Sequence, residues 1–197
     1  MRTGIDVSEH NGQIDWEAVS EAGIDFAIVR LGYGDKHLDE MFYENINGAI
    51  DAGLEVGVYY YSYALNREDA EQEAHYLANI LIDCGMTMDR LPMGVWFDME
   101  DADGFKRRNG ATGPKRLTDM CVAFIETCKA RGFDCGVYAS LDWLENRLDT
   151  DKFGDAPIWC AQWESADCEW DGAKIWQFTD DLEVDGKTFD GNFLMEV

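Results

Sequence analysis

The sequence predicts a single α/β domain folded as an irregular, TIM-like (β/α) barrel of about eight strands with fewer helices. Short apolar runs alternate with amphipathic segments, which is typical of parallel strands that are buried on both faces and linked by helices. The last third of the chain joins its strands by short loops, which favours an irregular barrel over an open doubly wound sheet. No linker, repeat or low-complexity stretch divides the 197 residues, so the domain is expected to span 1–197.

The first half of the chain supplies strands and helices in alternation. Continuous apolar runs predict strands at 5–8, 26–32 and 56–63. Helical spacing of apolar residues predicts helices at 15–19, 41–52 and 67–82. Asp15 suits a helix N-cap and Gly53 suits the end of a helix, which defines two of these boundaries.

The second half begins in the same way and then loses its helices. A strand is predicted at 93–101, a helix at 118–130 ending near Gly132, and a strand at 135–140. Two further strands, 157–163 and 174–179, are joined by a loop too short for a full helix. The tail, 184–193, has the pattern of a hairpin or a last short strand.

Composition and charge exclude several classes of partner. A formal charge of −24 argues against binding to nucleic acid or to an anionic membrane surface, and favours a soluble monomer. No apolar run is long enough for a transmembrane helix. The six cysteines form no C-x-x-C pair, so buried free thiols are favoured over an oxidised pair.

The strand at 93–101 ends in two carboxylates. Asp98 and Glu100 lie two residues apart, which places both side chains on the same face of a strand. Neighbouring acids repel each other, so one of them holds its proton above the ordinary pKa. Such a pair supplies an acid and an anion at one pH, the equipment needed to cleave a glycosidic bond. The alternative is a solvated strand end without a chemical role.

Polar side chains recur where the other predicted strands end, and the C-terminal strand ends of such barrels carry the chemistry. They are Asp6, Ser8, Arg30, Tyr61, Tyr63, Tyr138, Ser140, Gln177 and Thr179. The chain is also rich in aromatic residues, with seven Trp, eight Tyr and ten Phe. This surplus suits a cleft that stacks against sugar rings, although large aromatics also fill barrel cores.

Five blocks, in the right order, resemble glycoside hydrolase family 25, the muramidases (lysozymes) with an irregular barrel. The blocks are 4–8 with 11–12 and 14–16, 42–49 with 52–54 and 56–59, 97–100, 175–178, and 189–193. The resemblance covers almost the whole chain. The chain departs from the family at Tyr60, where histidine is frequent, and this change concerns cleft detail and leaves the acid pair intact.

The resemblance implies roles for individual residues. Glu100 would donate a proton to the leaving sugar oxygen, and Asp98 would be its partner anion, acting as nucleophile, base or acetamido-orienting group. No cofactor or metal is implied. The expected substrate-binding residues are Asp6, Asp190, Tyr59, Tyr61, Tyr138, Trp176 and Gln177.

The implied activity is hydrolysis of the β-1,4 bond between N-acetylmuramic acid and N-acetylglucosamine, with the glycan strands of bacterial peptidoglycan as partner. The expected place of action is extracellular or in the cell wall. The sequence shows no room for a signal peptide before the first strand, so export would follow another route, such as phage-lysin-like release, or the signal was removed.

Three alternatives remain open at this stage. The chain could be a chitinase-like hydrolase of N-acetylglucosamine polymers, because that class also ends a strand in D-x-E. It could be a cell-wall sugar-binding module without catalysis. Finally, Asp98, Glu100, Asp101 and Asp103 could form a site for a hard cation such as Ca²⁺ or Mg²⁺.

Overall fold

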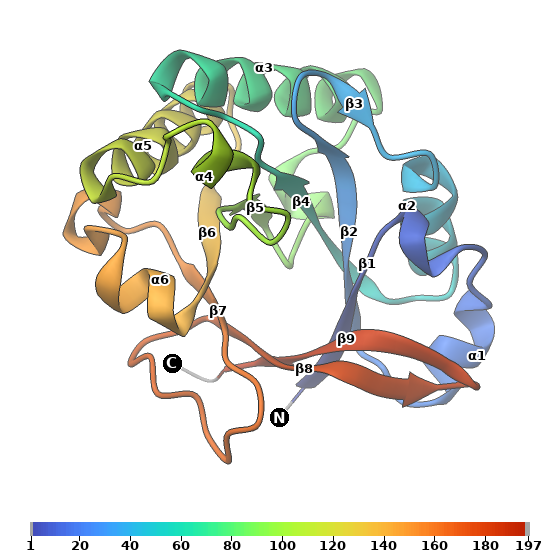
Figure 1. Ribbon diagram of the computed structural model, residues 1–197. Helices are drawn as coiled ribbons and strands as arrows, with labels where there is room; N and C mark the ends of the chain where they lie inside the picture. The colour runs from blue at the N-terminus through green and yellow to red at the C-terminus, as the bar shows by residue number, and fades with distance from the viewer. Residues whose placement is uncertain (1, 196–197) are drawn as a thin grey trace.

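Eight strands of the computed structural model, which describes residues 2–195, close into a barrel (Figure 1). The strand order around the barrel is β1-β9-β8-β7-β6-β5-β4-β2, and pairing of β1 with β2 closes it. The short β3 is added to β2 as an antiparallel hairpin. The strands are β1 Arg2–Val7, β2 Phe26–Tyr33, β3 His37–Leu38, β4 Glu55–Tyr61, β5 Val95–Asp98, β6 Cys135–Ser140, β7 Ile158–Ala161, β8 Ile175–Val184 and β9 Lys187–Leu194.

The barrel is irregular because its last strand runs against the others. From β1 through β8 neighbouring barrel strands are parallel, whereas β9 is antiparallel to both β8 and β1. The predicted fold class is thus confirmed, down to the helix-poor C-terminal third. The parallel strands share one end of the barrel, where their carboxyl termini meet.

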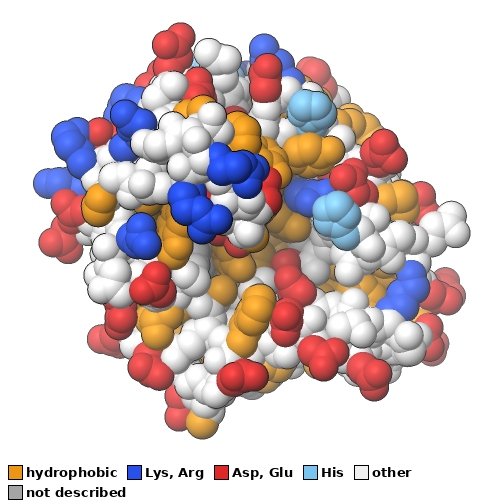
Figure 2. All heavy atoms as spheres, viewed as in Figure 1, with side chains coloured by type: hydrophobic (Ala, Val, Ile, Leu, Met, Phe, Trp, Pro, Cys, Tyr) orange, Lys and Arg blue, Asp and Glu red, His pale blue; other side chains and the backbone are white. Residues whose placement is uncertain are grey.

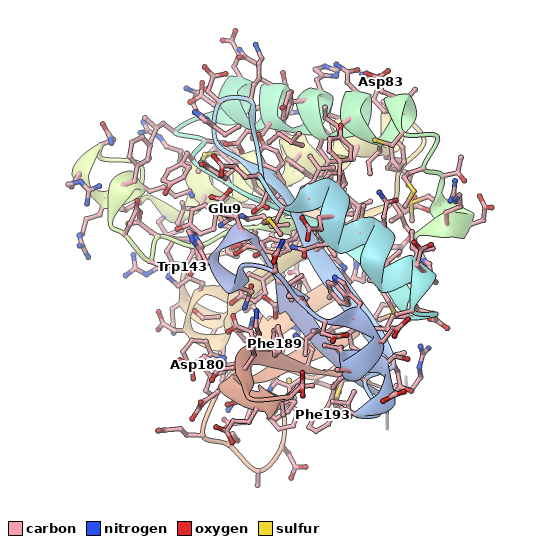
Figure 3. The ribbon with its side chains drawn as sticks, turned by 90° about the vertical axis from the view of Figure 1, so that its right-hand side faces the viewer. Glu9, Asp83, Trp143, Asp180, Phe189 and Phe193 are labelled. Carbon is pink, nitrogen blue, oxygen red and sulfur yellow. The ribbon has the colours of Figure 1, made fainter. Side chains whose placement is uncertain are left out.

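The helices surround the barrel unevenly. They are α1 Trp16–Glu21, α2 Phe42–Asp51, α3 Arg67–Asp83, α4 Phe105–Arg108, α5 Pro114–Ala130 and α6 Leu141–Asn146, with 3-10 turns at Glu9–Asn11, Met88–Arg90 and Thr150–Phe153. The long α3 and α5 pack side by side against the barrel. In Figure 3, α3 with Asp83 at its end and the β8–β9 hairpin with Phe189 lie on opposite sides of the molecule.

Several predicted boundaries shift for local reasons. The helix predicted at 118–130 starts at Pro114, since proline suits the first helical turn. The strand predicted at 93–101 ends at Asp98, so Glu100 lies beyond its last residue. The strand at 174–179 continues to Val184 and pairs with β9 around a turn at Asp185. The short helices α4 and α6 were not predicted.

Alternation along the strands separates two apolar layers. One cluster of buried residues packs between the strands and the helices. A second, smaller cluster fills the barrel interior and comprises Phe26, Ile28, Met93, Trp96, Trp159 and Ile175. Glycine makes room for these rings: a Cβ at Gly136 would lie 2.4 Å from the Trp96 ring. The interior below the strand ends is therefore solidly packed.

Two predictions about the surface and the thiols can be compared with the structure. Among residues 2–195 no helix is long and apolar enough to cross a membrane. The six cysteines are free thiols, with Cys121, Cys128, Cys135 and Cys160 buried, Cys168 partly exposed and Cys84 exposed.

Candidate active site

A cavity of about 530 Å³ opens at the C-terminal ends of the barrel strands. Figure 2 looks onto this hollow in the middle of the molecule, with acidic side chains along its border. The residues that line it come from most strands of the barrel and include Asp6, Ser8, Arg30, Tyr59, Tyr61, Tyr63, Asp98, Glu100, Tyr138, Gln177 and Asp190.

The acid pair lies at the end of β5. Asp98 is the last residue of the strand and is only 4% exposed, and its Oδ1 accepts no hydrogen bond from the described residues. Burial, then repulsion from Glu100, raises the pKa of Asp98 well above its ordinary value. Burial also raises the pKa of Glu100, which Lys106 opposes and Asp190 reinforces. Both acids therefore favour the protonated form more than free carboxyls do.

Two more carboxyls face the pair from β1 and β9. Asp6 and Asp190 stand opposite each other in the antiparallel register of these strands. The Asp6 Oδ2 atom accepts hydrogen bonds from Gln177 Nε2 at 2.9 Å and Asn192 Nδ2 at 2.7 Å. Burial and the Asp190 charge nevertheless raise the pKa of Asp6 well above normal. Burial and then Asp180 raise the pKa of Asp190 to about 6.

Ionisation of all four carboxyls around one cavity costs free energy, because their charges repel one another. Each of the four has a raised pKa, and burial is the largest cause in every case. The cluster therefore retains protons to a higher pH than free carboxyls do, and it can donate them beside anions that stabilise positive charge. Because the acids interact, the titration belongs to the group as a whole.

Tyrosine side chains and Trp159 complete the walls of the cavity. Tyr59, Tyr61 and Tyr63 all line the cavity, as strand alternation predicts for this run. On the other side, Tyr138 OH donates to Gln177 Oε1 at 3.0 Å, and Trp163 Nε1 donates to the same atom at 3.1 Å. Gln177 thus connects the aromatic wall to Asp6 and is itself held in place by four partners, the fourth being Asp190 at 3.4 Å.

The structure brings together every predicted site residue except one. Trp176 lies on β8 next to Gln177, so its side chain points to the opposite face of the strand. It packs against Phe178 and Phe193, and its Nε1 donates to Gln162 O at 2.8 Å. The structure therefore places Trp176 outside the cavity, where it has a packing role.

Other lining residues were not among the predicted site residues. The Arg30 guanidinium pairs with Asp39 Oδ2 at 2.7 Å through Nε and with Glu9 Oε1 at 3.0 Å through Nη2. Glu9, labelled in Figure 3, and His10 lie on the 3-10 turn after β1, and both line the cavity. The signal for Arg30 was its charge at the end of a strongly apolar strand. His10 carries no comparable signal in the sequence.

The acids that follow the pair have a structural task. Asp101 accepts hydrogen bonds from the Lys106 and Arg107 amides at 2.6 and 3.0 Å, and Asp103 accepts one from Phe105 N at 2.8 Å. These contacts cap the start of α4. In the part of the chain that the structure describes, no group of three or more His, Cys, Asp or Glu side chains is arranged to hold a metal ion. The hard-cation alternative gains no support from this geometry.

A closed, irregular barrel with paired acids in an aromatic-walled cavity at its C-terminal strand ends is the architecture of a glycosidase. The family model for glycosyl hydrolases family 25 matches residues 5–187. The chain therefore belongs to glycosyl hydrolase family 25.

Two lysozymes are similar in sequence to this chain. The chain is 34% identical to Lysozyme M1 of Streptomyces globisporus over 179 residues and 24% identical to an autolytic lysozyme of Clostridium acetobutylicum over 184. These matches cover 89% and 93% of the chain but 60% and 52% of the relatives, so the chain spans little more than half of their length.

Solved structures give the same picture. The modular autolysin LytC of Streptococcus pneumoniae, solved in complex with a synthetic peptidoglycan ligand, superposes with a TM-score of 0.83 at 26% identity. The match covers 97% of this chain and 46% of LytC.

Proposed function

We propose that this protein hydrolyses the β-1,4 bond that joins N-acetylmuramic acid to N-acetylglucosamine in bacterial peptidoglycan. The observation that carries the proposal is the Asp98–Glu100 pair at the end of β5, with Asp98 buried, in a cavity walled by tyrosines. The lysozyme names of the curated relatives and the peptidoglycan ligand of LytC support this substrate class. The substrate would put the site of action at the bacterial cell wall.

Glu100 is proposed as the general acid. It lies past the end of β5, is less buried than Asp98, and lines the cavity. Burial raises the pKa of Glu100, so a larger fraction of the protein carries the proton that the leaving sugar oxygen needs. Protonation of that oxygen lets the glycosidic bond break without release of an alkoxide.

Asp98 is proposed to hold the 2-acetamido group of the substrate. Its buried Oδ1 has no hydrogen-bond partner among the described residues, so it can accept a hydrogen bond from the acetamido N–H. The acetamido oxygen then attacks the anomeric carbon from within the sugar, and the carboxylate stabilises the positive charge that develops. The result is net retention of configuration without a sugar–enzyme bond.

This division of labour also places the proton. In the free protein, burial raises the pKa of both Asp98 and Glu100, and repulsion from Glu100 raises that of Asp98 further. A hydrogen bond donated by the substrate to Asp98 stabilises the ionised form of Asp98 and so lowers the pKa of Asp98. The proton that the two acids share then moves to Glu100. Substrate binding itself thereby protonates the general acid.

Product analysis tests the proposed bond. Digested peptidoglycan is reduced with borohydride and examined by mass spectrometry, which identifies the sugar at each new reducing end. The proposal expects the alcohol of muramic acid. The alcohol of glucosamine would instead indicate the chitinase-like specificity, and binding to cell walls without new reducing ends would indicate a non-catalytic module.

Substrate modification tests the proposed role of Asp98. Peptidoglycan from which the N-acetyl group of muramic acid has been removed lacks the internal nucleophile. Hydrolysis of it should fall far more than binding does, with acetylated peptidoglycan as the matched control. A glycosyl ester trapped on Asp98 would overturn this mechanism while leaving the proposed activity standing.

A further inference from the structure

A lysine is buried directly behind the acid pair. Lys106, on α4, is only 1% exposed. Its Nζ donates to the backbone oxygen of Glu100 at 2.9 Å and to that of Ser62. Ser62 follows β4 and Glu100 follows β5, so one ammonium group ties together the ends of two neighbouring barrel strands.

Burial of the Lys106 ammonium group lowers the stability of the fold. A buried ammonium loses strong hydration, and burial accordingly lowers the pKa of Lys106. Its two partners are neutral carbonyls, and none of the ion pairs among residues 2–195 includes it. An apolar side chain in such a place is often as stable or more stable. The lysine therefore points to a function other than stability.

The groups that face Lys106 decide where its charge acts. Burial raises the pKa of Glu73, on α3, to about 8, and that of the Cys121 thiol, on α5, above its usual value. Both are therefore neutral at acidic pH. The Asp101 carboxylate already accepts two amide hydrogens of α4. The Phe105 amide and, to a smaller degree, Lys106 lower the pKa of the exposed Asp103, which lies at the start of α4. Beside it, Lys106 opposes the rise in pKa of both Asp98 and Glu100.

We propose that Lys106 is a positioning residue of the hydrolysis proposed above: it fixes the Glu100 backbone and holds one negative charge on the Asp98–Glu100 pair. The inference rests on the proposed function, because a pair that carries both protons has no anion to orient the acetamido group. Lys106 itself does not line the cavity and acts through the two acids.

The test is the pH dependence of kcat/KM on peptidoglycan, whose acidic limb reports ionisation of the pair in the free protein. Lys106→Met and Lys106→Gln both remove the charge, and Lys106→Gln keeps a hydrogen-bond donor in case Lys106→Met does not fold. Each should move the acidic limb to higher pH by about one unit, the lower end of the effect of a close opposite charge. Lys106→Arg keeps the charge and should retain the wild-type limb.

Glu73→Gln is the matched control, because it alters the same buried cluster without removing the cation. Glu73 accepts hydrogen bonds from Ser62 Oγ and Tyr63 N, both at 2.8 Å, and burial raises the pKa of Glu73 to about 8. The acidic limb of the Glu73→Gln variant should stay at the same pH as that of the wild type. A wild-type limb in folded Lys106→Gln, or an equal displacement in Glu73→Gln, would overturn the inference.

A second readout separates this inference from the proposed function. Carboxyl ¹³C NMR titration of Asp98 and Glu100 needs no substrate, and Lys106→Gln should raise the first apparent pKa of the pair. If the wild-type protein releases no reducing ends, the proposed function fails, and the titration still tests the electrostatic role of Lys106. If hydrolysis occurs and the titration is unchanged by Lys106→Gln, only the present inference fails.

Discussion

The two ends of the barrel interior are built from the same strands and have opposite properties. On β2 the inward series begins with Phe26 and ends with Arg30, and on β5 it passes from Trp96 to Asp98. At the closed end aromatic rings meet edge to face, as Trp96 and Trp159 do at a centroid distance of 5.7 Å. At the open end four carboxyls with raised pKa values surround a cavity.

The difference shows how one fold separates stability from chemistry. The packed end gains free energy from apolar burial, whereas the acidic end loses it through desolvation and repulsion. Neighbouring inward-facing residues lie two positions apart along a strand, and this one step is enough to pass from the apolar packed end to the acidic end. Substitutions at the open end should therefore change activity more than stability, and substitutions at the closed end the reverse.

The largest expected effect is at the open end. Glu100→Gln cannot donate a proton, so activity should fall by roughly 10²–10⁴-fold or more, the usual contribution of general acid catalysis. The amide has nearly the same shape, so the circular dichroism spectrum should be unchanged. Retention of more than about a tenth of the wild-type rate would assign the donor to Asp6 or Asp190.

Asp98→Asn should lower activity severely and raise stability at neutral pH. Because the pKa of Asp98 is raised in the folded protein, the folded state binds more protons than the unfolded state, and stability falls as pH rises through that interval. Asparagine cannot ionise and escapes this loss. A gain of about 1 kcal/mol would raise Tm by roughly 2–4 °C.

Thermal unfolding at several pH values checks this prediction. The gain should disappear below the ordinary pKa of an aspartate, where the wild-type side chain is protonated in both states. A variant that is less stable than the wild type at neutral pH would show that the charge of Asp98 is not costly to the fold.

Gly136→Ala probes the closed end. The added Cβ would lie 2.4 Å from the Trp96 ring and 2.5 Å from Pro157 O, so neighbouring atoms must move. Overpacking of this kind costs about 1–3 kcal/mol of unfolding free energy. The acidic limb of the pH profile should stay in place, because no titrating group changes.

Gly113→Ala is the control for this substitution. A Cβ at Gly113 would meet no atom within 4 Å, and the residue has an ordinary φ of −69°. Chemical denaturation should place Gly113→Ala near the wild type and Gly136→Ala well below it. Equal stability of the two variants would contradict the picture of a tightly packed closed end.

The smallest expected effect concerns the cavity wall. Tyr138→Phe removes the hydrogen bond to Gln177, and the loss of one such bond, about 0.5–1.5 kcal/mol, corresponds to roughly a 2- to 10-fold drop in kcat/KM. Trp176→Phe, on the outward face of β8, should keep its kcat/KM. A larger loss in Trp176→Phe than in Tyr138→Phe would bring Trp176 back into the site.

Much of the fold and of the site could be predicted from the sequence because both follow from strand alternation. Continuous apolar strands indicated a barrel, and the two-residue period gathered Tyr59, Tyr61, Asp98 and Glu100 on one side. The same period, applied to β8, would have kept Trp176 out of the site once Gln177 was placed in it. Trp176 entered the predicted set because the block 175–178 was carried over as a unit.

The remaining features depend on tertiary contacts that a local pattern does not contain. The four-residue α4 is too short to show a period, and its Lys106 begins a run of three cations that indicates a solvated face. Its burial follows from the carbonyls of Ser62 and Glu100, which lie 44 and 6 residues away. His10 reaches the cavity because it lies on a 3-10 turn capped by Ser8. A turn this short has no hydrophobic period from which it could be predicted.

The central claim is that the open end of the barrel hydrolyses the glycosidic bond with Glu100 as acid and with the substrate's own acetamido group as nucleophile, oriented by Asp98. Proton NMR of a peptidoglycan fragment during hydrolysis tests it most directly, because the anomeric signal of the first product appears before mutarotation. The account predicts that the first product has the β configuration of the cleaved bond. A first product with the α configuration would contradict it.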